Sequence, residues 1–148
     1  MRTFKDSNGL SWDIAVNVGS LKRVKDMLNI DLIEESSKKE NIFIKVSENP
    51  IMLCDILYCL CKSQADERKI TDEKFGESLN GDAIEQATNM FIEELIDFFP
   101  SAKRPAFRMM TQKIEEMTTK GVEYVTKYLN SEEMETKIMS DIKKASGI

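Results

Sequence analysis

The sequence has no histidine, only three cysteines and no glycine-rich loop, and these absences narrow the chemistry open to it. Without histidine, the commonest general base near neutral pH is missing. No serine or cysteine stands beside a recognisable base, and no phosphate-binding glycine pattern occurs. We therefore expect a protein that acts by binding rather than by catalysis, is not an enzyme, and needs no cofactor.

Long apolar segments are missing as well. The start, Met-Arg-Thr-Phe-Lys, lacks the apolar stretch of a signal peptide, and no window reaches the roughly 18 apolar residues that a membrane-spanning helix needs. The net charge of −5 argues against nucleic acid as a partner, since phosphate backbones attract basic surfaces. We expect a cytoplasmic protein without membrane contact.

The three cysteines, Cys54, Cys59 and Cys61, fall in one apolar segment that begins at Pro50. Asp55 is the only charged residue of this segment before Lys62. A helix that is apolar nearly all round has to be surrounded by other helices. An odd number of cysteines at irregular spacing matches neither a disulfide framework nor a zinc site, so we expect reduced, metal-free thiols in the core.

A β-hairpin is predicted at the N-terminus, because Asn8-Gly9 stands between segments of alternating apolar residues. Leu10, Trp12, Ile14 and Val16 would share its apolar face. A two-stranded ribbon is marginal alone, so this face has to pack on helices or on another sheet. Trp12 is then a core or an interface residue.

Helices are predicted after plausible capping residues. Asn17 precedes an amphipathic helix to Leu28, Asn49 precedes the helix that starts with Pro50, and Thr71 precedes a short helix through Leu79. A longer helix starts at Gly81 or Asp82 and stops before Pro100, with Glu85, Glu93, Glu94 and Asp97 expected on its outside. We interpret 34–40 as an exposed loop, while 42–46 fits either a strand or a helical turn.

The last third of the chain has an apolar row of a different period. Its members alternate spacings of three and four over three heptads, which is the 3.5-residue repeat of paired helices. The row consists of Phe107, Met110, Ile114, Met117, Gly121, Tyr124 and Tyr128, on a helix that begins near Pro105. We call this row the seam and predict that Phe107, Met110, Ile114, Met117, Tyr124 and Tyr128 bind a helix from another chain.

A last helix is predicted after Asn130, with Met134, Ile138, Ile142 and Ala145 on one side. Five of the nine methionines fall in this last third, and thioethers adapt to varied partners. The alternative for the seam is an ordinary intramolecular core. The predicted fold is mainly α: a β-hairpin and compact helical domain over 1–104, followed by a long amphipathic helical extension over 105–148.

Several strings in combination resemble the tail assembly chaperones of long-tailed bacteriophages and prophages. The strings are Phe4-x-Asp6-Ser7-Asn8-Gly9-x-x-Trp12, Asn17-Val18-Gly19-x-x-Lys22-Arg23-Val24, Leu53-Cys54-Asp55-x-Leu57-Tyr58-x-Leu60-Cys61-Lys62-x-Gln64-Ala65-Asp66, Phe75-Gly76-Glu77-x-Leu79-x-Gly81-Asp82-Ala83-Ile84 and Glu94-Leu95-x-Asp97-Phe98-Phe99-Pro100. The resemblance covers about residues 4–104 and implies a non-enzymatic helper. Such a helper keeps the helical tape measure protein soluble until tail tube subunits polymerise around it.

Other functions stay open at this stage. A structural tail or connector protein would share the hairpin and helices but remain in the virion. A regulator that binds nucleic acid could use the basic residues Lys22, Arg23 and Lys25. We also expect self-association, and a second copy of the chain is the alternative occupant of the seam. If the seam is internal, the acidic region between Asp66 and Asp97 is the alternative binding surface.

Overall fold

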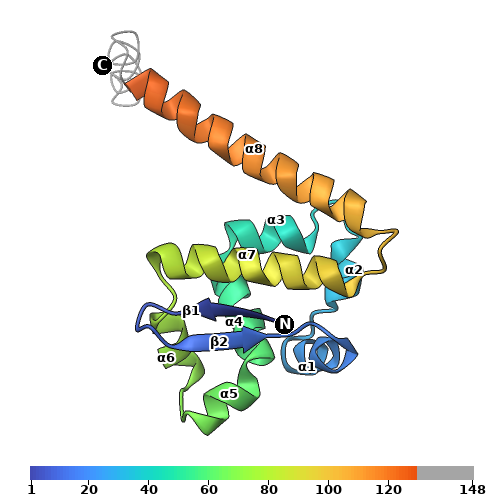
Figure 1. Cartoon of the computed structure of the whole chain (residues 1–148), viewed down its shortest axis with the longest axis vertical. Helices are drawn as coiled ribbons and strands as arrows, with labels where there is room; N and C mark the ends of the chain where they lie inside the picture. The colour runs from blue at the N-terminus through green and yellow to red at the C-terminus, as the bar shows by residue number, and fades with distance from the viewer. Residues whose placement is uncertain (130–148) are drawn as a thin grey trace, which may run out of the picture. The chain divides into compact units, whose positions relative to one another are not determined.

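The computed structural model of this chain describes residues 1–129, and side chains as far as Met117. The fold is mainly helical with an N-terminal two-stranded antiparallel sheet, which confirms the predicted fold class (Figure 1). The chain divides into two units, Met1–Arg108 and a second that begins at Met109. The helix predicted after Asn130 lies outside the described residues.

The predicted hairpin and the burial of Trp12 are confirmed. Strands β1 (Arg2–Lys5) and β2 (Ser11–Ile14) pair with Phe4 opposite Trp12, and both aromatic side chains are fully buried. Leu10, which we placed on the same apolar face, precedes β2 and is exposed. The apolar face is therefore shorter than the alternation predicted.

The turn of the hairpin is longer than the two-residue Asn-Gly turn that the sequence predicts. The N–H of Asp6 donates to the Leu10 carbonyl (2.9 Å), and the N–H of Gly9 donates to the Asp6 carbonyl (3.0 Å). Only Gly9 in this turn has a positive φ, of 82°. This is the pattern of longer hairpin loops, in which a left-handed glycine follows a tight turn.

A buried carboxylate organises this turn. Asp6 accepts hydrogen bonds from the indole N–H of Trp12 (2.9 Å) and from the backbone N–H groups of Asn8 (2.9 Å) and Leu10 (3.0 Å). A carboxylate with three donors offsets the cost of its burial. On the Trp12 ring itself, the guanidinium of Arg68 lies 4.5 Å from the centroid.

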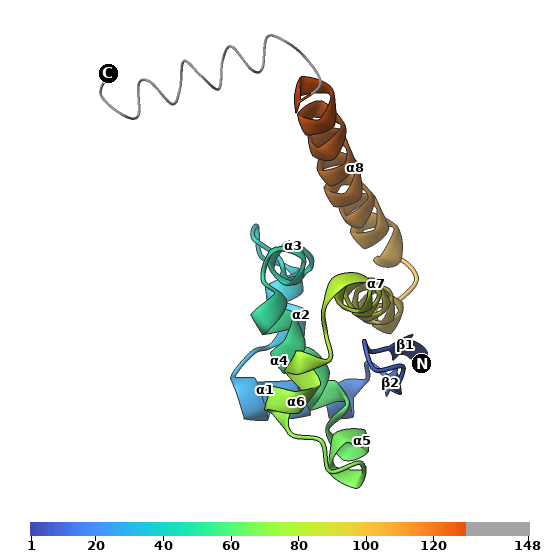
Figure 2. The same ribbon diagram turned by 90° about the vertical axis from the view of Figure 1, so that its left-hand side faces the viewer.

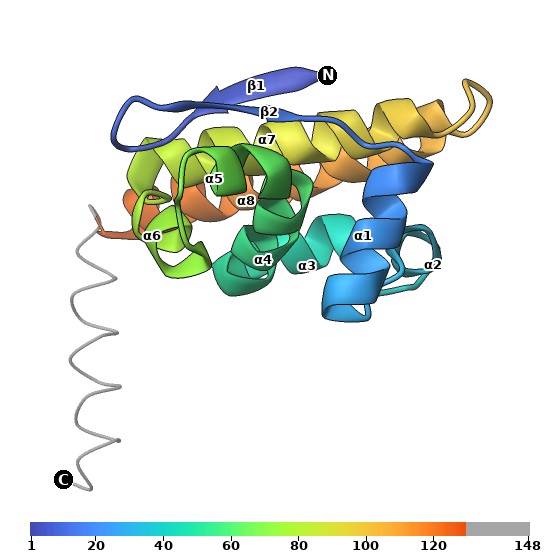
Figure 3. The same ribbon diagram turned by 90° about the horizontal axis from the view of Figure 1, so that it is seen from below.

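Helix α7 (Gly81–Phe98) lies between the hairpin on one side and α3 (Ile42–Glu48) on the other (Figure 1). Seen nearly end-on in Figure 2, α7 has the hairpin below it and α3 and α4 beside it. In Figure 3 the hairpin runs along the length of α7. The hairpin thus buries its apolar face on a helix, as a two-stranded ribbon must.

Helix α4 (Pro50–Leu60) is central to the first unit, as its apolar sequence predicts. It packs against α1 (Val18–Leu28), α3, α6 (Asp72–Glu77) and α7, and Leu53, Ile56 and Leu57 are fully buried. It ends at Leu60, and the short helix α5 (Lys62–Glu67) follows. The single long helix suggested by the apolar segment is therefore two helices.

The predicted capping residues are confirmed. The side chains of Asn17, Asn49 and Thr71 accept hydrogen bonds from the third residue of α1, α4 and α6, and Pro50 stands at the start of α4. In α1, the Ser20 hydroxyl also accepts from the Asn17 N–H, which completes a capping box.

The loop predicted over 34–40 is wrong in its first part, where α2 (Leu32–Ser36) forms. Asp31 caps this helix by accepting from the N–H groups of Ile33 and Glu34. Glu35 forms ion pairs of 2.7 Å with both Lys38 and Lys45. The ambiguous segment after it is the helix α3, capped by Asn41.

The cysteine thiols are free, with Cys59 and Cys61 buried and Cys54 half-buried. Burial, the largest cause in each case, raises the pKa of Cys54 to about 11 and that of Cys61 to about 12. The reactive thiolate is therefore scarce at neutral pH. Among the side chains that the structure describes, no group of cysteine, aspartate and glutamate residues could hold a metal ion.

If α4 is the centre of the core, Leu57→Ala should lower the free energy of unfolding by roughly 2 to 5 kcal/mol, because it leaves a cavity. Ile51→Ala on the same helix is the matched control, since Ile51 is 75% exposed, and should cost less than about 0.5 kcal/mol. Urea unfolding followed by circular dichroism gives both values. A loss below about 1 kcal/mol for Leu57→Ala would place α4 at the periphery.

Asp6→Asn should lower the free energy of unfolding by roughly 1 to 3 kcal/mol. The NH₂ group of asparagine cannot accept a hydrogen bond, so one of the three donors would lose its acceptor. Trp12 fluorescence should shift to longer wavelength and become easier to quench with iodide. Asp26→Asn, on the exposed side of α1, is the control and should leave both properties unchanged. Retention of the native spectrum and stability in Asp6→Asn would contradict the role given to Asp6.

Candidate functional site

The seam lies on α8 (Arg104–Leu129), a continuous helix of 26 residues. Residues three and four apart share one side of a helix, so the helical backbone keeps the seven seam positions in one row. The predicted helix start near Pro105 is confirmed. The first four seam residues have described side chains, whereas for Gly121, Tyr124 and Tyr128 the backbone alone is described.

The first turn of α8 belongs to the first unit and closes its core. Arg104 donates to the Phe99 carbonyl (2.8 Å) and the Asp97 carbonyl (2.9 Å) at the end of α7. The Phe107 ring lies 4.5 Å from that of Phe99 and 5.4 Å from that of Phe43, between centroids. Phe107 therefore packs within its own chain, although the sequence placed it among the partner-binding residues.

Beyond Phe107 the seam becomes more exposed. Met110 and Ile114 are half-buried, and Met117 is 73% exposed. Met109, beside the seam, is also exposed. Among the described side chains, every buried apolar residue lies between Phe4 and Phe99. The seam beyond Phe107 therefore contributes no fully buried residue to the described core.

Arginine side chains engage the carboxylates near the end of α7. Arg2 contacts Glu94 at 2.9 Å and Asp97 at 2.7 Å. Arg108 contacts Glu93 at 2.9 Å and Asp97 at 3.1 Å. The hydrogen bond from Arg2 is the largest cause that lowers the pKa of Asp97 below its usual value.

The placement of Glu94 on the outside of α7 is wrong. Its side chain is buried because β1 packs on α7 and brings Arg2 over it, and the N–H of Val16 also donates to it (3.4 Å). These carboxylates are thus part of the packing between hairpin and helix. At its Asp97 end, the acidic region between Asp66 and Asp97 therefore has fewer unpaired carboxylates than its sequence suggests.

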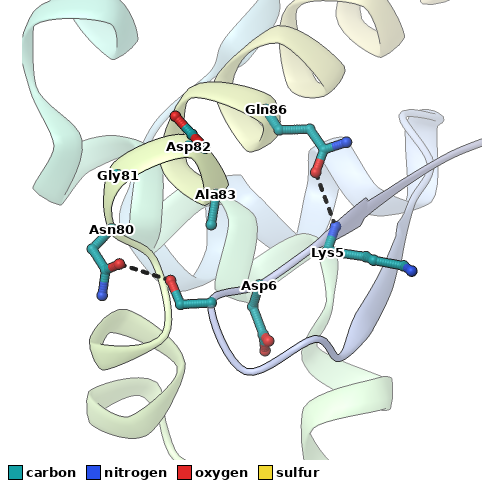
Figure 4. A pocket seen from close by; sticks show the side chains of 8 residues that line it. Lys5, Asp6, Asn80, Gly81, Asp82, Ala83 and Gln86 are labelled. Carbon is teal, nitrogen blue, oxygen red and sulfur yellow. Dashed lines mark hydrogen bonds between the residues drawn. The ribbon is translucent and has the colours of Figure 1, made fainter.

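An open hollow lies where the hairpin turn meets the start of α7 (Figure 4). Gln86 accepts from the Lys5 N–H (3.3 Å), and the Ser7 hydroxyl donates to Asn80 (2.8 Å). Asp6, which lines the same hollow, is engaged by Trp12. The polar groups here join the hairpin to α7.

One of the basic side chains of α1 has a structural role. Arg23 donates to the Cys59 carbonyl (3.2 Å) and so ties α1 to the end of α4. Lys22 and Lys25 are exposed.

Among the described helices, none is long and apolar enough to cross a bilayer.

Comparison of the chain with protein-family models, with curated proteins and with solved structures gave no match. The row of exposed and half-buried apolar side chains on α8 makes this helix the best candidate for binding a partner.

The pairing of Asp97 predicts a dependence of stability on pH. Because its pKa is lowered in the folded protein, the ion pairs stabilise the fold above about pH 4, and this contribution disappears as the pH falls through the lowered pKa. Asp97→Asn should cost less than about 1 kcal/mol at pH 7, since the pair is partly exposed. Its difference from the unsubstituted protein should therefore be smaller at about pH 3 than at pH 7.

Urea unfolding at the two pH values measures this difference. Asp55→Asn, at an exposed site on α4, is the control for removal of a surface carboxylate. An Asp97→Asn variant that is equally destabilised at both pH values would show that the carboxylate acts by packing rather than by charge.

Proposed function

We propose that this protein is a tail assembly chaperone of the kind encoded in long-tailed phage tail gene clusters. In this proposal it acts in the cytoplasm of the bacterial host and binds the helical tape measure protein through the seam of α8. Binding keeps this client soluble until tail tube subunits polymerise around it. The support comes from the sequence strings between Phe4 and Pro100 and from the surface of α8.

The observation that carries the proposal is the exposure of apolar surface along α8 after the core has ended. The last buried apolar residue among the described side chains is Phe99, yet the seam continues to Tyr128. Met117, 73% exposed, is a large apolar side chain in the middle of that row. Apolar rows of period 3.5 pair with other helices.

The residue types of the seam suit a client with a long repetitive helix. Methionine side chains repack around differently shaped partners, so one surface can accept many segments. Gly121 lets a partner backbone approach closely.

The experiment is co-expression with the tape measure protein, which the proposal predicts to be encoded immediately downstream as a long helical protein. We expect the client to be soluble with this chain and insoluble without it. Met117→Lys, alone and with Met110→Lys, should abolish co-purification, because a charge in the seam would be buried on binding. The helical circular dichroism and melting temperature of the chain should stay nearly unchanged.

Ile51→Lys is the matched control, because Ile51 on α4 is as exposed as Met117 but lies outside α8. It should leave the client soluble. Unfolding of the seam variants would make the seam intramolecular core and reject the proposal. Recovery of the chain in purified virions would favour the alternative, a structural tail or connector protein.

A further inference from the structure

A row of lysines follows one edge of the seam. Lys113, Lys120 and Lys127 are seven residues apart within the helical segment of α8. With the seam at positions a and d of a heptad, these lysines occupy position g, which borders the apolar row. The opposite edge, position e, has Thr111, Thr118 and Val125 and is uncharged.

The charge of α8 differs from that of the whole chain. Its sequence has five basic and three acidic side chains, a net charge of +2, whereas the full chain has a net charge of −5. Charges at e and g contact the neighbouring helix in a coiled coil and set the choice and orientation of the partner. The lysine row therefore bears on which helix the seam accepts.

A second copy of α8 has no charges that complement this row. In a parallel pair, position g faces e of the partner, so lysine would meet threonine or valine. In an antiparallel pair, g faces g, so lysine would meet lysine, and like charges at this position disfavour pairing. Self-association through the seam would therefore have no favourable charge pair in either orientation.

Acidic residues of α8 itself do not remove this preference. The heptad places Glu116 and Glu123 at position c, beyond the lysine row as seen from the seam, and four residues before Lys120 and Lys127. Such pairs stabilise the isolated helix. An ammonium group has three donors and can engage a second carboxylate from a partner. The residue four positions before Lys113 is Met109, which has no carboxylate.

We propose that the seam takes an amphipathic helix of another protein whose apolar stripe is bordered by aspartate or glutamate. The site is the one assigned to the client under the proposed function, and the lysine row narrows the client segments that fit it. An antiparallel client would place its acidic residues at g, and a parallel one at e.

Two designed peptides of about three heptads test this charge preference. Both have leucine at a and d; one has glutamate at e and g, and the other has lysine. Fluorescence anisotropy of each labelled peptide with the full chain measures binding. We expect the acidic peptide to bind roughly five- to tenfold more tightly in about 50 mM salt, and the difference to shrink in about 0.5 M salt.

Lys113→Glu, Lys120→Glu and Lys127→Glu together should reverse the preference toward the basic peptide. The matched control replaces three exposed lysines of the first unit, Lys22, Lys25 and Lys39, by glutamate. It changes the net charge by the same amount and should keep the preference for the acidic peptide. Circular dichroism checks that both triple variants fold.

Equal binding of the two peptides, tighter binding of the basic one, or reversal by the control variant would overturn the charge preference. If, in that case, the client stays soluble with the variant that replaces Lys113, Lys120 and Lys127 by glutamate, the proposed function stands without the charge preference. A dimer in analytical ultracentrifugation that Met117→Lys dissociates would make a second copy the occupant instead. Failure of both peptides to bind, with client solubility insensitive to Met117→Lys, would reject the seam as a binding site altogether.

Discussion

The packing of the hairpin on the helices depends on the pairing of Asp6 with Trp12. The indole can be buried completely because its N–H donates to the Asp6 carboxylate, and the same carboxylate holds the turn. The Trp12 ring then packs edge-on against Phe75, 4.9 Å away, and Phe75 lies 5.6 Å from Tyr58. This chain of rings joins β2, α6 and α4, and it anchors a ribbon that would not be stable alone.

Once the hairpin covers α7, the first unit has a complete core. Arg2 pairs with the carboxylates of α7, and Arg104 and Phe107 close the end of that helix. Apolar surface further along α8 is then not required for this core. A protein that has satisfied its core retains such surface at a cost in solubility, which is why an apolar row of this kind points to a partner.

Charge and apolar surface have different roles on α8. The methionines make the seam tolerant of shape, and tolerance alone would admit many wrong helices. In the proposed complex, lysines along one edge would restrict the choice by charge, because a wrong partner would bring neutral or like charge to that edge. The combination suits a binder that accepts many segments of one kind of helix.

Local signals in the sequence determined much of this fold. The hairpin at Gly9, the caps at Asn17, Asn49 and Thr71 and the apolar helix from Pro50 depend on a few neighbouring residues, so the sequence alone predicts them. Tertiary structure decided what depends on distant residues. Glu94 is buried because β1 brings Arg2 over α7, and Phe107 turns inward because Phe43 and Phe99 meet it. A helix-period pattern shows which residues share a side of a helix, but only the packed chain shows whether that side is already covered.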